Sequence, residues 1–314
     1  MATLYSGPGK VYMSSIALQP EGENGPIKID VKEETAPISS AMFGYLGEQV
    51  VNQEADITLT PFDNWGNLAL LYPSFLGVTI GASTGALQVG SLAHTGTKVP
   101  AKVWTPDGRI YHAVRAAVVG HPSLHLGIGK ALFGEARIAC IADSTKSLGD
   151  SSAIFNGNAI TESAGSDPGG TFVMSDFVRG AWTGAWGAVT GFTAIEAEDE
   201  WTIEVNAKYS PLKVQGLTRA MKLDSVQFMA KVRPYGPTHT QILGIVGGHT
   251  AGQRLGSADL VLTGPSSKTI TLKNVGLRGA GFEFGGTRLG TGEIGFVTGA
   301  TFTAGAPDPL LIFS

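Results

Sequence analysis

Few residues in this chain have the type and spacing that catalysis or metal binding requires. Six histidines are scattered along the 314 residues, and only His121 and His125 stand four apart. Two zinc ligands at that spacing would have to share one face of a helix. Pro122 and the alternating apolar residues around this pair predict a strand instead. We therefore interpret the histidines as solvent-facing, and the sequence predicts no metal and no cofactor.

The other motifs that carry chemistry are incomplete. Gly127-Ile-Gly129 lacks the third glycine of a dinucleotide fingerprint, because position 132 is leucine. The chain contains no GxxxxGK[ST] phosphate loop, no GxSxG elbow and no CxxC pair. Cys140 is the only cysteine, and its apolar surroundings predict a small buried side chain. Glu135 and Glu293 each open an expected strand as a structural charge, so we expect no enzyme.

The elements that would position such residues are written twice in the sequence. Ala101–Ile141 aligns without a gap to Asp259–Gly299 at a shift of 259 − 101 = 158 positions. Ile27–Val31 aligns to Trp201–Val205 at a shift of 201 − 27 = 174 positions, and both are apolar at every second residue. That period is typical of a strand with one buried face. We interpret the match as an internal duplication; the alternative is that Gly-rich β sequences resemble one another by composition.

Composition favours a mainly β protein with two domains. Forty-four glycines and sixteen prolines predict many short strands joined by turns, and 43% hydrophobic residues allow real cores. We expect two tandem β-sandwich or barrel domains, residues 1–143 and 180–314, each with one short helix, joined by a Gly/Ser/Pro-rich connector at 144–179. The helices are expected near Trp65–Leu71 and after Thr238. No apolar run or N-terminal pattern predicts a membrane span or a cleaved leader.

Charge is balanced in both halves. Residues 1–143 carry nine Lys and Arg against twelve Asp and Glu, and residues 180–314 carry eleven against ten. Neither half has the basic excess that holds nucleic-acid phosphates by counterion release. The protein is therefore not expected to grip DNA.

The segment Glu33–Glu54 is too apolar at its centre for a solvated loop. It contains Met42, Phe43, Tyr45 and Leu46, whereas its counterpart Pro211–Met221 is polar and basic. The segment could fold back into its own domain or project as a hairpin whose tip another subunit buries. We favour the projecting hairpin, because two domains of one fold need similar cores while their outer contacts can differ.

The order of these parts resembles the tail tube proteins of long-tailed, siphophage-type bacteriophages. An irregular N-terminal arm is followed by a strand pair, an extended hairpin, one helix near Trp65–Leu71 and Gly-broken closing strands. The likeness covers nearly the whole chain, once per half, and depends on pattern without a diagnostic motif. Tail tube proteins stack as hexameric rings around a channel for DNA. A duplicated chain departs from the common single-domain form, so three copies would form a pseudo-hexameric ring.

The resemblance implies a structural virion protein of the tail, assembled in the host cytoplasm, that conducts double-stranded DNA without binding it specifically. Its partners would be further copies of itself and other tail proteins at the tube ends, with no membrane partner. The residues expected to stack one ring on the next are Met42, Phe43, Tyr45, Leu46, Val214, Leu217 and Arg219. The acidic residues expected near the channel are Asp30, Glu33, Glu34 and Glu204.

Two other functions fit the same sequence. One is a different virion β-protein, such as a capsid decoration or baseplate component. The other is a carbohydrate-binding β-sandwich module, in which Trp104, Trp182, Trp186 or Trp201 would be sugar platforms. A hydrolase is the most remote option, because the sequence contains no acid/base constellation.

Overall fold

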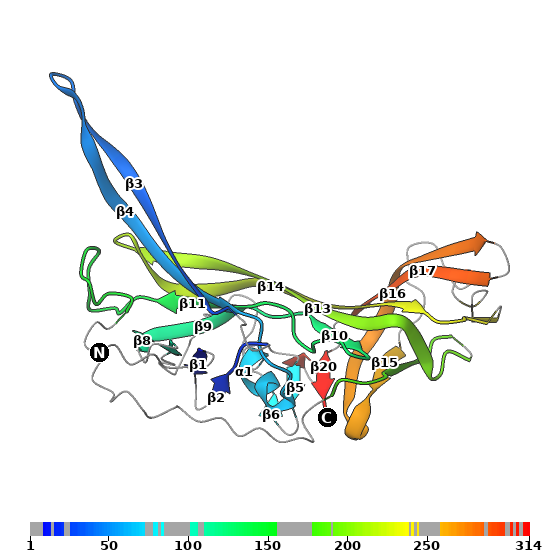
Figure 1. The fold of residues 1–314 in the computed structure, drawn as a ribbon. Coiled ribbons are helices and arrows are strands. Elements are labelled where there is room, and N and C mark those ends of the chain that lie inside the picture. Colours follow the sequence, from blue (N-terminus) through cyan, green and yellow to red (C-terminus); the bar gives the residue numbers. More distant parts are fainter. Residues whose placement is uncertain are drawn as a thin grey trace.

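The structure is a computed structural model, and it is mainly β (Figure 1). It describes residues 9–13, 16–21, 26–72, 78–80, 83–84, 101–105, 110–155, 178–189, 191–238, 240–241, 244, 258–285, 288–298, 302–303, 306–307 and 310–314. The expected N-terminal arm at 1–8 and the middle of the expected connector, 156–177, lie outside these residues. Below, residues 1–143 are called the first half and residues 180–314 the second half.

The first half contains most of the short strands. Its strands are β1 (Lys10–Met13), β2 (Ile16–Leu18), β3 (Lys28–Ser40), β4 (Gly44–Leu59), β5 (Val78–Ile80), β6 (Ser83–Thr84), β7 (Ala101–Trp104), β8 (Ile110–Ala113), β9 (Arg115–Gly120), β10 (Leu124–Gly127) and β11 (Ala136–Ile141). The helical turn between β4 and β5 consists of η1 (Trp65–Asn67) and α1 (Leu68–Leu71).

The second half contains the longest strands. Its strands are β12 (Thr183–Trp186), β13 (Ile195–Val214), β14 (Leu217–Pro234), β15 (Ala258–Thr263), β16 (Thr269–Gly285), β17 (Arg288–Thr298), β18 (Phe302–Thr303), β19 (Ala306–Pro307) and β20 (Leu311–Phe313). The short 3-10 turn η4 (Pro265–Ser267) joins β15 to β16.

One large sheet runs through both halves. Among the described residues its order is β6-β5-β20-β16-β15-β12-β13-β14-β4-β11-β9, with β3 on β4, β10 on β13, and β17 on β14 and β16. The halves meet where β10 pairs antiparallel with β13 and where β14 touches β4 at Leu217 and Gln53. A smaller sheet, β2-β1-β7-β8, belongs to the first half. In this smaller sheet β1 and β2 form an antiparallel hairpin.

The helical turn of the first half begins as the sequence predicts. The side chain of Asn64 accepts a hydrogen bond from the Gly66 amide at 2.8 Å, so Asn64 is the cap and not Asp63, which is buried. In the second half, Thr238 and Gln241 exchange reciprocal hydrogen bonds of 3.3 and 2.7 Å, the pattern of a capping box. The apolar residues expected after this cap, at 242, 243 and 246, lie outside the described residues.

The core is built from both halves and is rich in aromatic rings. The ring centroid of Phe296 lies 5.1 Å from that of Trp186 and 6.3 Å from that of Trp201. Trp182, Trp186 and Trp201 are all buried, and for Trp186 and Trp201 alternation along their strands turns the ring inward. A buried indole cannot serve as a sugar platform, so the carbohydrate-binding interpretation is wrong for these three residues. Trp104 is half-buried.

The hairpins β3–β4 and β13–β14 have the same internal irregularities. Over the length that the two hairpins share, each has two β-bulges, which leave Val51 and Leu46 unmatched in β4, and Asp224 and Arg219 unmatched in β14. The pairing of β13 with β14 has a third register shift, between Ala197 and Trp201, which lies before that shared length. The offsets are 224 − 51 = 173 and 219 − 46 = 173. Bulges bend a strand at a defined place and are maintained as structural features. The two hairpins therefore have the same bend pattern.

The third strand of each half joins its hairpin in matching register. Among the pairs, Ile29 is opposite Ile57 and Ile57 opposite Ile138, while Ile203 is opposite Ala230 and Ala230 opposite Phe296. The offsets are 203 − 29 = 174, 230 − 57 = 173 and 296 − 138 = 158, the shifts found in the sequence. A backbone pair between Leu124 and Phe133 likewise has a counterpart between Phe282 and Thr291, 158 positions later.

The described ends of the expected connector are packed against the first half. The amide of Asp143 donates to the Ala153 carbonyl at 2.8 Å, and Ala153 and Ile154 are buried. At the other end, the Arg179 guanidinium pairs with the buried carboxylate of Asp63 and with Glu21. Both contacts anchor this segment to the first half, so its described residues are not a free linker.

Candidate interaction surfaces

The hairpin β3–β4 projects far from the rest of the molecule (Figure 1). At its tip Met42 is 83% exposed and Phe43 is 72% exposed, and Tyr45 and Leu46 are also exposed. The turn reverses the chain at Gly44, whose φ of +71° is in the left-handed region. A large apolar cluster at the end of a two-stranded hairpin is a typical contact surface. The expected projecting hairpin is present.

The corresponding hairpin β13–β14 has its tip on the first half. The Gln53 amide donates to the Gly216 carbonyl and the Ala142 amide donates to the Thr218 carbonyl, each at 2.9 Å. Gly216 has a φ of +74°, and a Cβ there would lie 2.3 Å from the Val51 carbonyl oxygen. Only glycine permits so close an approach of the two main chains.

This packing changes the set of expected stacking residues on the second hairpin. Val214 is exposed and remains available. Leu217 is fully buried in the chain's own core, so its assignment to a stacking surface is wrong. The Arg219 guanidinium donates to the carbonyls of Asp143 and Lys146, which fixes it between the two halves. The sequence could not reveal these contacts, because they join segments more than seventy residues apart.

A cavity of about 610 Å³ lies between the tip of β13–β14 and strands β4, β9 and β11. The Arg137 guanidinium lies 2.8 Å from Asp56, and the Lys213 ammonium lies 2.7 Å from Glu54. The hydrogen bond from Lys213 is the main cause that lowers the pKa of Glu54. Both carboxylates are therefore paired with cations. Such ion pairs are better suited to holding the two halves together than to acid or base chemistry.

Three of the four acidic residues expected near the channel share one face of the sheet. Asp30 and Glu204 alternate with core-facing Ile29 and Ile203, so both point away from the core, and Glu34 has the same parity as Asp30. Glu33 has the opposite parity and bonds to Gln53. It therefore does not belong to the same face.

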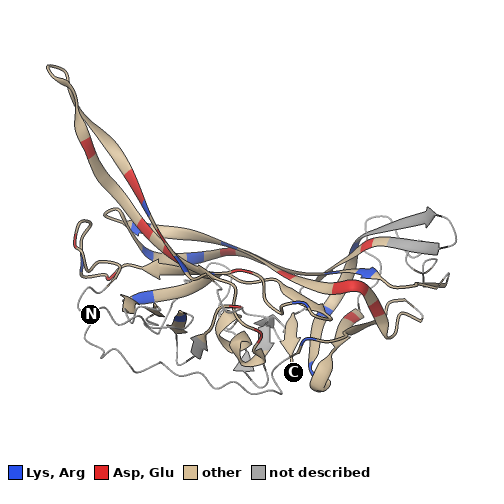
Figure 2. Ribbon diagram, in the orientation of Figure 1, with Lys and Arg blue, Asp and Glu red and all other residues tan. Residues whose placement is uncertain are grey.

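The acidic face is locally neutralised by lysine. Lys28 lies 3.0 Å from Asp30, and Lys231 lies 2.6 Å from Glu204. The hydrogen bond to Glu204 raises the pKa of Lys231. Figure 2 shows acidic and basic positions interspersed along both long hairpins. This face presents ion pairs and not a field of one sign.

Glu135 and Glu293 are exposed, so they do not form a buried acid pair.

His121 contradicts the prediction of solvent-facing histidines, because it is buried where the two halves meet. Its Nδ1 lies 2.5 Å from the Leu71 carbonyl oxygen at the end of α1, and its Nε2 lies 2.9 Å from the Tyr209 hydroxyl on β13. Burial lowers the pKa of His121 to about 4, even though the bond to Leu71 raises it. Residues 121–123 connect β9 to β10 and are not part of the strand that the sequence predicts.

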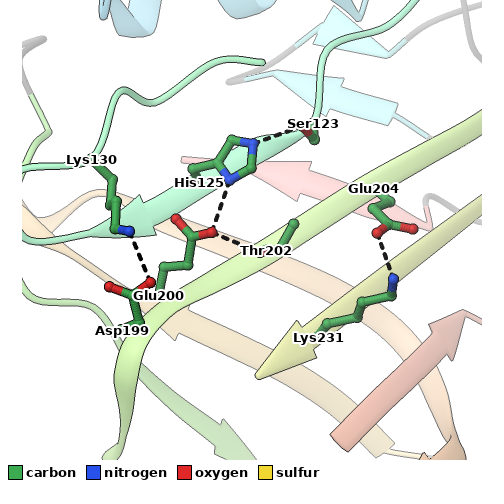
Figure 3. A network of polar contacts seen from close by, with 8 residues as sticks. All are labelled: Ser123, His125, Lys130, Asp199, Glu200, Thr202, Glu204 and Lys231. Carbon is green, nitrogen blue, oxygen red and sulfur yellow. Dashed lines mark hydrogen bonds and ion pairs between the residues drawn. The ribbon is translucent and has the colours of Figure 1, made fainter. Parts of the chain in front are cut away.

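His125 takes part in a network that joins β10 to β13 (Figure 3). Its Nε2 lies 2.9 Å from the Ser123 hydroxyl, and its Nδ1 lies 3.1 Å from a carboxylate oxygen of Glu200. The Lys130 ammonium adds an ion pair of 2.8 Å to Asp199 on the same seam. His125 is half-buried by these partners, so it is not free in solvent either.

The serine, histidine and glutamate of this network stand in the order of a nucleophile, a base and an orienting acid. Such a relay is recognised by geometry and not by sequence position. Ser123 and His125 are two residues apart, so alternation places them on the same side of the chain without a catalytic reason. The cavity described above is lined by other residues. Glu200 could not be predicted as a partner of His125, because 75 residues separate the two in the sequence.

The remaining chemical candidates are inert in this environment. Cys140 is buried, and burial together with nearby Asp56 raises the pKa of its thiol to about 12. Among the described residues, no group of three His, Cys, Asp or Glu side chains is arranged to hold a metal ion. In the same part of the chain, no helix is both long and apolar enough to cross a membrane. His94, His239 and His249 lie outside the described residues.

No family model and no curated protein matches this chain.

Proposed function

We propose that this protein is a structural virion protein whose copies form rings that stack into a phage tail tube and conduct double-stranded DNA. Each chain would supply two tandem tail-tube-like units, residues 1–143 and 180–314. Three chains would then make a pseudo-hexameric ring. Other tail proteins would bind the ends of the tube. The protein would be assembled in the host cytoplasm and located in the virion tail, and it would act without a cofactor or catalysis.

The observation that carries this proposal is the matched pair of hairpins. Both have two bulges at the same offsets, and both continue into a third strand at the register that the sequence shift predicts. Two like units side by side in one chain are what a ring of like units requires. A head-to-tail contact repeated around a ring closes on itself and leaves no open edge.

The exposed tip of β3–β4 supports contact between rings. Met42 and Phe43 are the most exposed large apolar side chains among the described residues, apart from Ile128 in a turn after β10. A hairpin that ends in such residues gains stability when another subunit covers them. Stacking of one ring on the next would provide that cover, with Tyr45, Leu46 and Val214 at the same contact.

The charge pattern supports a conduit through which DNA passes. Asp30 and Glu204 each have a lysine partner on their face, so phosphates would meet ion pairs and no basic groove. Tight binding would stop DNA from sliding. A face without basic excess avoids that.

Electron microscopy of the purified protein tests the proposal. We expect rings or tubes with a central hole, and threefold symmetry with six similar lobes per ring. The double variant Met42→Ser/Phe43→Ser should still form rings but should not stack them into tubes. Ile128→Ser removes an equally exposed apolar side chain from a turn and should stack normally. A monomeric protein without rings under any condition would refute the proposal.

One observation favours a second candidate, a serine hydrolase built on Ser123, His125 and Glu200. A fluorophosphonate probe decides between the two, because it labels only an activated serine. Labelling that disappears in Ser123→Ala would establish the hydrolase. We expect no labelling, since alternation along the chain already explains the contact of Ser123 with His125.

A further inference from the structure

The strand pairing between the two halves of one chain is of a kind that can also form between two copies. In it, β10 of the first half adds to the edge of β13 in the second half, with Leu124 opposite Ile203 and Leu126 opposite Trp201. The second half therefore has an outer neighbour on its first long strand. The first long strand of the first half, β3, is paired only with β4 among the described residues.

Burial differs between the two long hairpins in the way that a missing neighbour would cause. Val31 on β3 is 51% exposed, whereas its counterpart Val205 on β13 is 9% exposed. Val50 on β4 is 40% exposed, whereas its counterpart Leu223 on β14 is fully buried. The residues are apolar in both hairpins, so the sequence of the first hairpin is suited to a cover that the single chain does not provide.

The strand β10, which pairs with the edge of β13, also has a counterpart. Residues 282–285, at the end of β16, stand 158 positions after β10. Phe282 pairs with Thr291 of β17, as Leu124 of β10 pairs with Phe133. Among the described residues, no strand other than β17 lies beside residues 282–285. β15, β12, β13 and β14 lie between β16 and β4 in the sheet order, so residues 282–285 cannot reach β3 of the same chain.

We propose that residues 26–29 of one copy, which include the first two residues of β3, pair antiparallel with residues 282–285 of a second copy, in the register that β13 and β10 use within the chain. The register follows from the residue numbers of the pairs Ile203–Leu124 and Thr202–His125. Subtracting 174 from the β13 numbers and adding 158 to the β10 numbers places Ile29 opposite Phe282 and Lys28 opposite Glu283. The pairing completes two open edges at once and joins residues of opposite charge directly across the strands. This pairing would be the lateral contact between neighbouring chains of the ring, so it rests on the proposed function.

Cysteine cross-linking tests this register. Lys28→Cys and Glu283→Cys are made in separate chains, which are then co-assembled and oxidised. Residues opposite one another on antiparallel strands have Cα atoms roughly 4.5–5.5 Å apart, within the range of a disulfide. The native Cys140 is buried and does not compete. We expect a covalent dimer of the two chains, and none when either variant is oxidised alone.

A register control uses Lys32→Cys with Glu283→Cys. Residue 32 has the same parity as residue 28 but lies roughly 13 Å farther along the strand. It should not cross-link. Equal cross-linking of residues 32 and 28, cross-linking of Lys28→Cys with itself, or no cross-link at all would each overturn the proposed pairing.

Charge reversal is a second measurement that needs no disulfide. Lys28→Glu should weaken assembly roughly fivefold, and adding Glu283→Lys in the same chain should restore it. If Lys28→Glu leaves assembly unchanged, or if adding Glu283→Lys does not restore the lost assembly, the pairing is contradicted. Electron microscopy of the same samples separates the two proposals. Tubes without the cross-link refute only the register, whereas cross-linked dimers without rings refute only the tube.

Discussion

Protonation of His121 should weaken the contact between the two halves of the chain. The neutral ring donates from Nδ1 to Leu71 and accepts at Nε2 from Tyr209. A protonated ring can no longer accept at Nε2, and its charge would be buried. Acid should therefore destabilise the folded chain through this residue.

The size of the effect follows from the pKa. The ordinary value of 6.5 falls to about 4 in the folded chain, a difference of 2.5 units. The unfolded chain therefore binds the proton below pH 6.5, while the folded chain binds it only near pH 4. Stability is lost as the pH falls through this window, and the total loss is about 3 kcal/mol. That is a large share of the 5–15 kcal/mol or so that holds a typical domain folded.

Urea unfolding followed by tryptophan fluorescence, at several pH values between 7 and 4, measures this loss. The free energy of unfolding of wild type should fall more steeply than that of His121→Gln, by up to about 1.4 kcal/mol per pH unit. Other groups titrate alike in both proteins and cancel in the comparison. The same pH slope in both proteins would refute the reasoning. If the variant does not fold, an NMR titration that gives the wild-type ring a pKa near 6.5 would do so as well.

Three further predictions concern the close approach at Gly216, the ion pair of Arg179 and the buried thiol of Cys140. Gly216→Ala should destabilise the protein by about 2 kcal/mol or more in urea unfolding, because its Cβ would meet a carbonyl oxygen 2.3 Å away; Gly44→Ala, with a similar φ but nothing within 4 Å, should cost about 1 kcal/mol. Arg179→Met should cost about 3 kcal/mol by leaving the buried Asp63 carboxylate without its cation, and an unchanged midpoint would contradict this. Cys140 should react with a thiol reagent only at the rate of unfolding, since it is buried and its pKa is about 12; rapid labelling of the native protein would count against that burial.

Local features of the fold could be predicted from the sequence. Alternation of apolar residues located the strands around Ile29 and Ile203, and the offset between them agrees with the register of the two hairpins. The cap at Asn64 and the capping pair at Thr238 depend on residues within a few positions of each other. Such features are set by neighbours along the chain, so a single sequence contains them.

The structure removes part of the predicted interaction surface, and the reason is the docking of the halves. The exposed tip at Met42 and Phe43 follows from composition, because a polar turn does not need such residues. The burial of Leu217 does not, because it requires the second hairpin to lie on the first half. Nothing in the polar sequence around it distinguishes a free tip from a docked one.

Alternation in the sequence alone indicated the long strands around Ile29 and Ile203, whereas the alignment of the two halves as a duplication stays a prediction. Which distant side chains meet could be seen only in the folded chain: His121 with Tyr209, and Arg179 with Asp63. Strand periodicity is a property of adjacent residues and survives in any arrangement of the sheet. Contacts between residues about ninety or more positions apart depend on how the strands are ordered and how the halves pack, and many orders satisfy the same local pattern.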